Sequence, residues 1–80
     1  MKQITLYSRA WCSWCIEAKE YLIAHQMEFT EVDVGKDRAA WDEMVRISKQ
    51  DYVPVIDIDG HVLANFDTDQ LEKFLAEIDA

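Results

Sequence analysis

Two cysteines three positions apart constrain the fold of this chain more than any other feature. They lie in residues 11–15, Trp-Cys-Ser-Trp-Cys, and are the only cysteines among 80 residues. Residues 2–7, which precede them, place Ile4 and Leu6 on one face as a strand does. Residues 16–26, which follow them, space their apolar side chains as a helix does. The pair is therefore expected where a strand gives way to a helix.

A thiol at the start of a helix is chemically activated. The helix N-terminus carries a partial positive charge and free backbone N–H groups, and both stabilise the thiolate, which is the reactive form of cysteine. We expect Cys12 at the helix cap, facing water, and Cys15 one turn further on and half-buried. This asymmetry predicts that Cys12 attacks a substrate disulfide and that Cys15 resolves the resulting mixed disulfide.

Two other uses of the cysteine pair compete with this one. A structural disulfide would enclose only two residues and would remove little entropy from the unfolded chain. A zinc or iron–sulfur site usually takes four ligands, whereas this chain has no second cysteine pair, and His25 and His61 are far apart in sequence. Thiol–disulfide chemistry is therefore the favoured interpretation, and we expect no bound metal.

Composition and charge narrow the class of protein. Acidic residues outnumber basic ones by 16 to 8, and the resulting net charge of −8 argues against nucleic acid or an anionic membrane as a partner. No apolar run is long enough to span a membrane, and the first residues lack the apolar segment of a signal peptide. We expect one domain over residues 1–80, located in the cytoplasm, where thiols stay reduced.

The next elements predict a βαβ unit. Residues 27–34 form an expected second strand, which lies parallel to the first because a crossover helix connects them. Asp37 is a suitable N-cap for a second helix that runs to about Ser48. The helical spacing of Trp41 and Met44 places both on the buried side of this helix.

The last third of the chain predicts a hairpin and a third helix. Residues 53–58 and 61–64 form expected strands, joined by the two-residue turn Asp59-Gly60, whose residues tolerate positive φ. Asp67, with a glutamine three residues later, forms an expected capping box at the start of the last helix. The order β-α-β-α-β-β-α predicts an α/β fold with one mixed four-stranded sheet flanked by three helices.

Three motifs together resemble the glutaredoxin family. They are Trp-Cys-x-x-Cys after a short strand, Val53-Pro54 before a hairpin, and Phe66-Asp67 leading into the last helix. More closely, the chain resembles the short glutaredoxin-like redoxins, which include proteins that reduce ribonucleotide reductase, and the resemblance covers essentially the whole chain. It implies a thioredoxin fold with strand order 2-1-3-4 and a cis bond before Pro54, packed beside the cysteines.

The resemblance also implies substrate-binding residues. The backbone of Val53 would pair with the extended chain of glutathione or of a protein segment. Arg9 stands where many glutaredoxins carry a lysine that helps to bind glutathione; the alternative is an ordinary solvated loop arginine. Trp11 and Trp14 are expected to form an apolar rim that docks substrate, the alternative being that they pack on the domain's own surface. Tyr52 stands where a threonine often precedes Val-Pro.

Besides Tyr52, the chain departs from the family pattern at two further places. Ser13-Trp14 replaces the Pro-Tyr pair that is common between the cysteines, and it keeps an aromatic ring beside the thiols. Residues 63–67 replace a glycine-containing turn before the last helix, where Asn65 can adopt a left-handed conformation and Asp67 matches an acidic residue of the family. We place Asn65, Phe66 and Asp67 among the expected substrate-binding residues.

The expected function is that of a dithiol oxidoreductase which reduces protein or glutathione-mixed disulfides through Cys12 and Cys15, with a part in electron transport and cell redox homeostasis. No cofactor is expected to be bound; glutathione or a thioredoxin-reductase-type enzyme would supply electrons. Expected partners are glutathione and disulfide-bearing proteins, ribonucleotide reductase among them, and we expect a monomer. The alternative is an iron–sulfur or metal carrier of the glutaredoxin type, in which two chains share a cluster through Cys12.

Overall fold

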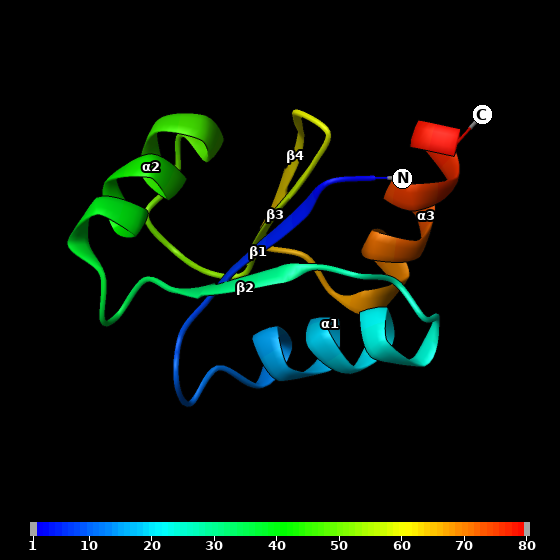
Figure 1. Ribbon diagram of the computed structural model, residues 1–80, viewed down its shortest axis with the longest axis horizontal. Coiled ribbons are helices and arrows are strands. Elements are labelled where there is room, and N and C mark those ends of the chain that lie inside the picture. The colour runs from blue at the N-terminus through cyan, green and yellow to red at the C-terminus, as the bar shows by residue number, and fades with distance from the viewer. Residues whose placement is uncertain (1, 80) are drawn as a thin grey trace.

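The computed structural model describes residues 2–79, and its elements follow the predicted order. Strands and helices alternate before a final hairpin and helix (Figure 1). The bounds are β1 (Ile4–Ser8), α1 (Ser13–Ala24), β2 (Thr30–Asp33), α2 (Arg38–Ser48), β3 (Val55–Ile58), β4 (His61–Ala64) and α3 (Thr68–Asp79).

The four strands form one mixed sheet in the order β2-β1-β3-β4, which confirms the predicted thioredoxin-like topology. β1 runs parallel to β2 and antiparallel to β3, and β3 runs antiparallel to β4. Figure 1 shows α2 on one side of this sheet, with α1 and α3 together on the other side. No helix among residues 2–79 is both long enough and apolar enough to cross a membrane.

Side chains that alternate along the strands build a separate core on each face of the sheet. On the α1 and α3 side, Leu6 and Ile56 pack with Leu22 of α1 and with side chains of α3. On the α2 side, Tyr7 and Met44 form the second cluster, together with Val34 and Val55. The two clusters hold all three helices against the sheet, and thereby fix where α1 begins relative to the strands.

Local signals account for most of the observed bounds. Asp37 caps α2 by accepting a hydrogen bond from the backbone N–H of Ala40 at 3.2 Å. Asp67 and Gln70 form the predicted capping box, since each side chain accepts the other residue's backbone N–H, at 2.8 and 3.0 Å. In the β3–β4 turn, Asp59 adopts a φ of 53° and the glycine after it a φ of 91°, as the predicted hairpin requires.

Several predicted bounds were wrong. α1 begins at Ser13, as the predicted cap at Cys12 requires, although the apolar spacing indicated residue 16. It ends at Ala24 instead of residue 26, because Gln26 turns into the left-handed region (φ 57°) and ends the helix. β2 starts at Thr30 instead of residue 27, since the residues before it contact the core without pairing with β1. β3 starts at Val55 instead of residue 53, because a proline lacks the N–H that a strand ladder needs.

Candidate active site

The strand register brings three loops to the same end of the sheet. Tyr7, near the carboxyl end of β1, pairs with Val55, the first residue of β3. Val55 in turn pairs with Ala64, the last residue of β4. The loops that follow β1, precede β3 and follow β4 therefore leave the sheet together. They hold the cysteine pair, the Val-Pro segment and the predicted left-handed turn, so the fold gathers most of the predicted site residues at one end.

Cys12 is the N-cap of α1, as predicted, and its sulfur replaces the usual oxygen acceptor. Cys12 Sγ accepts a hydrogen bond from the backbone N–H of Cys15 at 3.1 Å. The two sulfurs form a disulfide, with Cα atoms 5.2 Å apart. Cys12 is partly exposed, whereas Cys15 is only 2% exposed. The prediction of a half-buried Cys15 was wrong because Cys15 shares the inward stripe of α1 with Ala18 and Leu22.

The start of α1 favours negative charge on the cap sulfur. The first turn contains no acidic residue, so the partial positive charge of the helix N-terminus is not neutralised there. When the cysteine pair is reduced, the backbone N–H of Cys15 would donate its hydrogen bond to the Cys12 thiolate. A hydrogen bond to a thiolate favours this charged form over the neutral thiol. Exposure, capping and helix dipole thus all act on Cys12, while Cys15 lies behind it.

The two tryptophans beside the cysteines project outward. Trp11 has a φ of 68° and its side chain is 99% exposed, so packing on the domain's own surface does not account for its ring. A left-handed conformation is uncommon for a bulky residue and persists where the surroundings enforce it. Trp14, in the first turn of α1, is 45% exposed. Both rings are therefore accessible beside the exposed sulfur.

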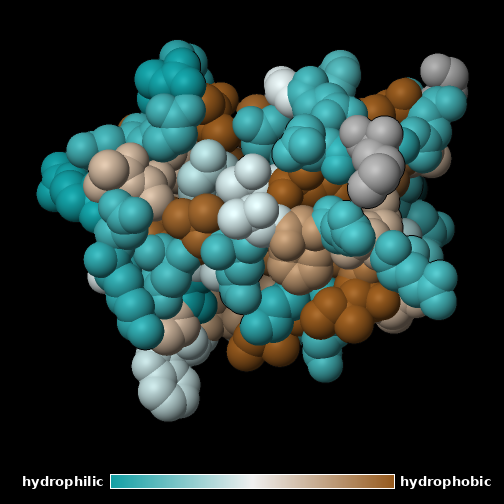
Figure 2. Space-filling view, viewed as in Figure 1, coloured by the Kyte–Doolittle hydropathy of each residue, from teal (hydrophilic) through white to brown (hydrophobic). Residues whose placement is uncertain are grey.

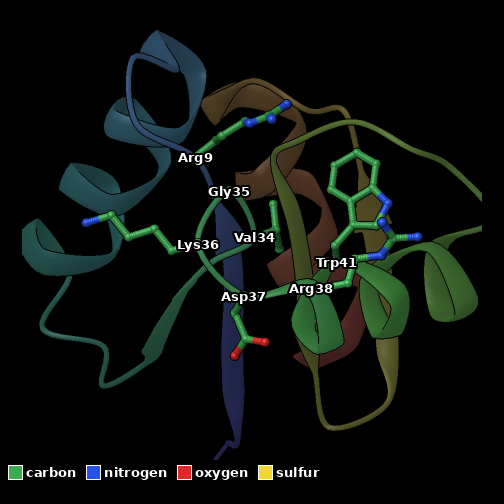
Figure 3. Close-up of a pocket in the computed structure, with 7 residues that line it drawn as sticks. All are labelled: Arg9, Val34, Gly35, Lys36, Asp37, Arg38 and Trp41. Carbon is green, nitrogen blue, oxygen red and sulfur yellow. The ribbon is translucent and has the colours of Figure 1, made fainter.

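Arg9 lies against an aromatic ring, a contact that the sequence interpretation missed. Its guanidinium carbon is 5.7 Å from the ring centroid of Trp41, within the range of a cation–π interaction. Arg9 and Trp41 line a cavity of about 350 Å³ together with Lys36 and Arg38 (Figure 3). Arg9 is exposed and contacts this ring. Trp41, which was predicted to lie in the core, is only half-buried.

The Val-Pro segment is connected to the turn before α3. The Val53–Pro54 bond is cis, as the resemblance implied, and the carbonyl of Pro54 accepts the N–H of Asn65 at 2.8 Å. Asn65 has the predicted left-handed backbone, with a φ of 53°. Tyr52 is exposed at the start of this segment. Phe66, in contrast, is 0% exposed and belongs to the core, so its ring supports the turn from inside.

A partly buried polar contact near the cysteine loop had no recognisable signal in the sequence. Ser8, at the end of β1, is 4% exposed and donates its hydroxyl to the Glu31 carboxylate at 2.9 Å. The Lys19 ammonium of α1 lies 3.3 Å from the same carboxylate. These three residues tie β1, β2 and α1 together beside the active-site loop. The contact depends on tertiary structure, because the residues are far apart along the chain.

Comparison with known proteins identifies the family. A sequence profile of glutaredoxins matches residues 4–63. The chain belongs to the glutaredoxin family. An uncharacterised glutaredoxin-like 8.6 kDa protein in a rubredoxin operon of Clostridium pasteurianum is 39% identical to it over 72 residues, which cover 90% of this chain and 96% of that one.

Solved structures agree with the fold. The crystal structure of a thioredoxin-like protein superposes with a TM-score of 0.82 at 31% identity, over 89% of this chain and 97% of the other. A glutaredoxin from Archaeoglobus fulgidus reaches a TM-score of 0.82 at 18% identity, over 94% of this chain and 87% of that one. Within this glutaredoxin-like fold, Cys12 and Cys15 lie at disulfide distance.

Within residues 2–79, no group of three or more histidine, cysteine, aspartate or glutamate side chains is arranged to hold a metal ion. The arrangement of the two cysteines suits reversible formation and cleavage of a disulfide. Cys12 is partly exposed and caps α1 with its sulfur, while Cys15 is buried immediately behind it.

Proposed function

We propose that the protein is a dithiol oxidoreductase that reduces protein or glutathione-mixed disulfides, with Cys12 as nucleophile and Cys15 as resolving cysteine. The observation that carries this proposal is the hydrogen bond from the Cys15 backbone N–H to Cys12 Sγ at the cap of α1. It supports a thiolate at Cys12 and places the second sulfur one turn behind it. Membership of the glutaredoxin family supports the same assignment.

The reaction would proceed in two exchanges. The Cys12 thiolate attacks one sulfur of a substrate disulfide R–S–S–R′, forms a Cys12–S–S–R mixed disulfide and releases R′S⁻. Cys15 then loses its proton, attacks Cys12 Sγ and releases RS⁻, which leaves the Cys12–Cys15 disulfide. The two thiolates take up protons at neutral pH. The substrate gains two electrons, and the enzyme loses the same two.

The oxidised enzyme needs an external source of two electrons. We propose glutathione or a thioredoxin-reductase-type enzyme for this role, with no cofactor bound by the chain itself. Two glutathione thiols, or one dithiol, would reduce the pair through the reverse exchanges. The proposed substrates are disulfide-bearing proteins, ribonucleotide reductase among them, in a compartment that keeps thiols reduced.

The roles of the two cysteines can be tested by trapping. A Cys15→Ser variant cannot resolve the mixed disulfide, so incubation with glutathione disulfide should leave one glutathione on Cys12 in an intact-mass spectrum. In the matched Cys12→Ser variant, the remaining thiol is buried and should stay unmodified. An adduct on Cys15 of the second variant, or none on the first, would contradict the assignment.

The source of electrons can be tested by recycling the oxidised protein in two assays. One contains glutathione, glutathione reductase and NADPH; the other contains thioredoxin reductase and NADPH. Turnover only in the first assay would show that the turn at Asn65 still admits glutathione. Turnover only in the second would make the protein a thioredoxin-like redoxin. If neither assay gives turnover, both proposed donors are wrong. Visible absorption after anaerobic purification would instead favour a metal or cluster carrier.

A further inference from the structure

Exposed apolar side chains are concentrated on one helix. Five large apolar residues are exposed among residues 2–79, and three of them belong to α1, whereas α2 and α3 contribute none. The five are Trp11, Trp14, Ile16, Ile23 and Tyr52. A single exposed apolar residue has no special meaning, but a contiguous group often marks a binding surface.

The exposed side chains of α1 form a continuous stripe. Ile16 and Ile23, which are 51% and 60% exposed, are seven positions apart and therefore share one face of the helix. Glu20 lies between them on this face. Ile16 also lines a cavity of about 280 Å³ with Trp11, so the stripe continues to the active-site loop. Figure 2 shows separate apolar groups interspersed with hydrophilic ones at the lower margin of the molecule, where Figure 1 places α1.

The charges on this face determine which partner it fits. Glu17 and Glu20 are exposed, and neither takes part in an ion pair within residues 2–79. Lys19, the one basic residue of α1, is paired with Glu31. The stripe is therefore apolar, acidic and apolar in turn, and a basic segment with apolar side chains complements it. A second copy of this chain would instead bring its own net charge of −8, which opposes self-association.

The length of the stripe excludes a glutathione-sized ligand. At about 1.5 Å per residue, Ile23 lies about 17 Å along the helix from Cys12. A tripeptide spans at most about 11 Å when fully extended. A molecule that reacts at Cys12 and also contacts Ile23 must therefore be longer than glutathione, as a protein segment is.

We propose that the outer face of α1, formed by Ile16, Glu20 and Ile23, docks protein substrates through a basic, apolar segment next to their reactive disulfide. This inference rests on the proposed function and extends it, because it names the class of substrate. Docking at this face would raise the reaction rate for proteins that carry such a segment, and it would leave the reaction with small disulfides unchanged.

A binding experiment tests the surface separately from the chemistry. The protein would carry Cys12→Ser and Cys15→Ser, and the probe would be a fluorescent, cysteine-free amphipathic peptide of leucine and lysine. A matched peptide with glutamate for lysine serves as the control probe. We expect the lysine peptide to bind at least about tenfold more tightly, as charge complementarity predicts. Equal affinities for the two peptides would overturn the proposal.

Variants of α1 locate the binding site. Ile16→Ser/Ile23→Ser should weaken binding of the lysine peptide about tenfold, as loss of two contact side chains does. The matched control is Ala39→Ser/Ala76→Ser, on exposed positions of α2 and α3, and should bind as before. Glu20→Lys should reduce the preference for the lysine peptide. Unchanged binding in the isoleucine variant would mean that the net charge alone attracts the peptide, and would overturn the proposal.

Turnover distinguishes failure of this inference from failure of the proposed function. With both active cysteines present, the substrate would be the lysine peptide with one added cysteine that carries a glutathione mixed disulfide. Ile16→Ser/Ile23→Ser should lower kcat/KM for this peptide about tenfold and should leave turnover of glutathione disulfide unchanged. An equal loss of kcat/KM for the peptide and for glutathione disulfide would overturn the docking proposal. If the unmodified protein turns over neither, the proposed function fails, while the binding result stands on its own. A concentration-dependent dimer in sedimentation, abolished by Ile16→Ser/Ile23→Ser, would assign the face to self-association instead.

Discussion

α1 and α3 pack on the same face of the sheet, yet the two helices begin with different chemistry. α3 begins with a carboxylate cap, in which Asp67 accepts the N–H of Gln70 at 2.8 Å. α1 begins with a sulfur cap, in which Cys12 accepts the N–H of Cys15 at 3.1 Å. The cap position, three residues before the donor, is the same. The N-cap position of α3 holds a carboxylate that stabilises the helix, whereas the N-cap position of α1 holds a reactive sulfur.

The two helices also differ in their first turns and in the exposure of their apolar side chains. α3 carries Asp69 in its first turn in addition to its acidic cap, whereas α1 has no acidic residue in its first turn. The positive end of α1 thus remains available to a thiolate. α3 also keeps its large apolar side chains buried or partly buried, whereas α1 exposes several of its own. We infer that α3 is composed for folding, while α1 satisfies folding and partner contact together.

The largest expected effect is on turnover when the sulfur of α1 is replaced. Cys12→Ser should abolish disulfide reduction, because a hydroxyl cannot form the mixed disulfide. The serine oxygen is itself a good N-cap, so the free energy of unfolding of the reduced protein should change by less than about 0.5 kcal/mol. Turnover and urea denaturation measure the two quantities. Any residual turnover in Cys12→Ser would mean that Cys15 can act as the nucleophile.

The reciprocal change in α3 should affect stability. Asp67→Ala removes the cap carboxylate and half of the capping box, which should lower the free energy of unfolding by about 1 kcal/mol. Thermal melts should show a decrease in Tm of about 4–8 °C for a domain of this size. Asp37→Ala on α2 is the matched control for a cap away from this face. A loss of glutathione-dependent turnover in Asp67→Ala alone would assign Asp67 to substrate binding as well.

A smaller effect is expected when α1 is given the acidic first turn of α3. Ser13→Asp places a carboxylate at the start of α1, where it competes for the positive helix end and should raise the pKa of the Cys12 thiol. The change should be about 0.2–0.7 units, since such interactions contribute about 0.3–1 kcal/mol. Thiolate absorbance measured against pH in the Cys15→Ser background gives this value. Glu72→Ser in α3 is the control, and it changes the net charge by one unit in the opposite direction. A decrease of equal size in the pKa of Cys12 there would point to net charge instead of the helix end.

The same titration has a consequence for stability. If folding lowers the pKa of Cys12 below that of a free thiol, about 8.5, the reduced protein gains stability as the pH rises from the folded value toward 8.5. That stabilisation is complete above the unfolded pKa and is lost as the pH falls through the folded pKa. Ser13→Asp should raise the folded pKa of Cys12, and so narrow the pH window between that pKa and the unfolded one over which stability changes.

The parts of the fold that follow local chemistry could be predicted from sequence. Asp37, the Asp67 capping box and the Asp59-Gly60 turn were assigned correctly, because each depends on residues within one turn of the chain. The spacing of apolar residues indicated α1 only from residue 16, whereas the expected cap at Cys12 gave its start at Ser13 correctly. The two overlong strands reflect apolar residues that join the core without pairing in the sheet.

Parts of the site that depend on tertiary contacts could not be predicted in this way. The contact of Arg9 with Trp41 joins a loop to α2, and no spacing rule relates such distant residues. Phe66 was placed among the substrate-binding residues of the turn, yet its ring is fully buried, because it follows the left-handed Asn65 and points into the core. The exposure of Ile16 and Ile23 could not be predicted either, since apolar residues on a helix are ordinarily assigned to its buried side.

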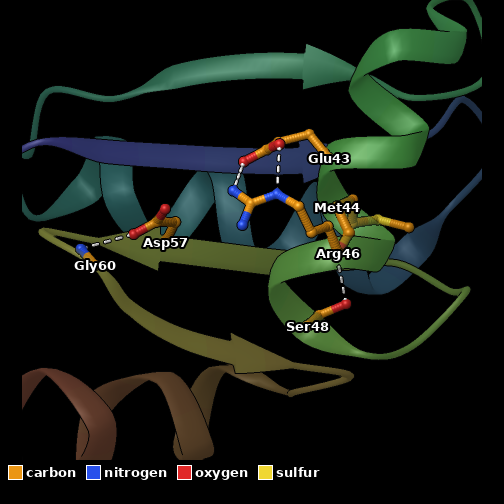
Figure 4. Close-up of polar contacts among 6 residues, drawn as sticks. All are labelled: Glu43, Met44, Arg46, Ser48, Asp57 and Gly60. Carbon is orange, nitrogen blue, oxygen red and sulfur yellow. Dashed lines mark hydrogen bonds and ion pairs between the residues drawn. The ribbon is translucent and has the colours of Figure 1, made fainter.

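The smallest expected effect concerns the other face of the sheet, where charged groups surround Tyr7. Burial raises the pKa of the Tyr7 hydroxyl, Glu43 and Asp57 raise it further, and Arg46 lowers it. Figure 4 shows Arg46 paired with Glu43 on α2, and Asp57 accepting the N–H of Gly60. This face thus disfavours a negative charge on Tyr7, in contrast to the start of α1, which favours one on Cys12.

A raised pKa gives the opposite pH dependence to that of Cys12. The stabilisation by neutral Tyr7 is complete below the unfolded pKa of about 10 and is lost as the pH rises through the folded pKa. Tyr7→Phe should therefore make the free energy of unfolding fall less steeply above pH 10 in denaturation experiments. Glu43→Gln should reduce the slope only partway, because Asp57 and burial still act on Tyr7. An unchanged slope in Tyr7→Phe would mean that other groups cause the alkaline loss of stability, and the contrast between the two faces would not hold.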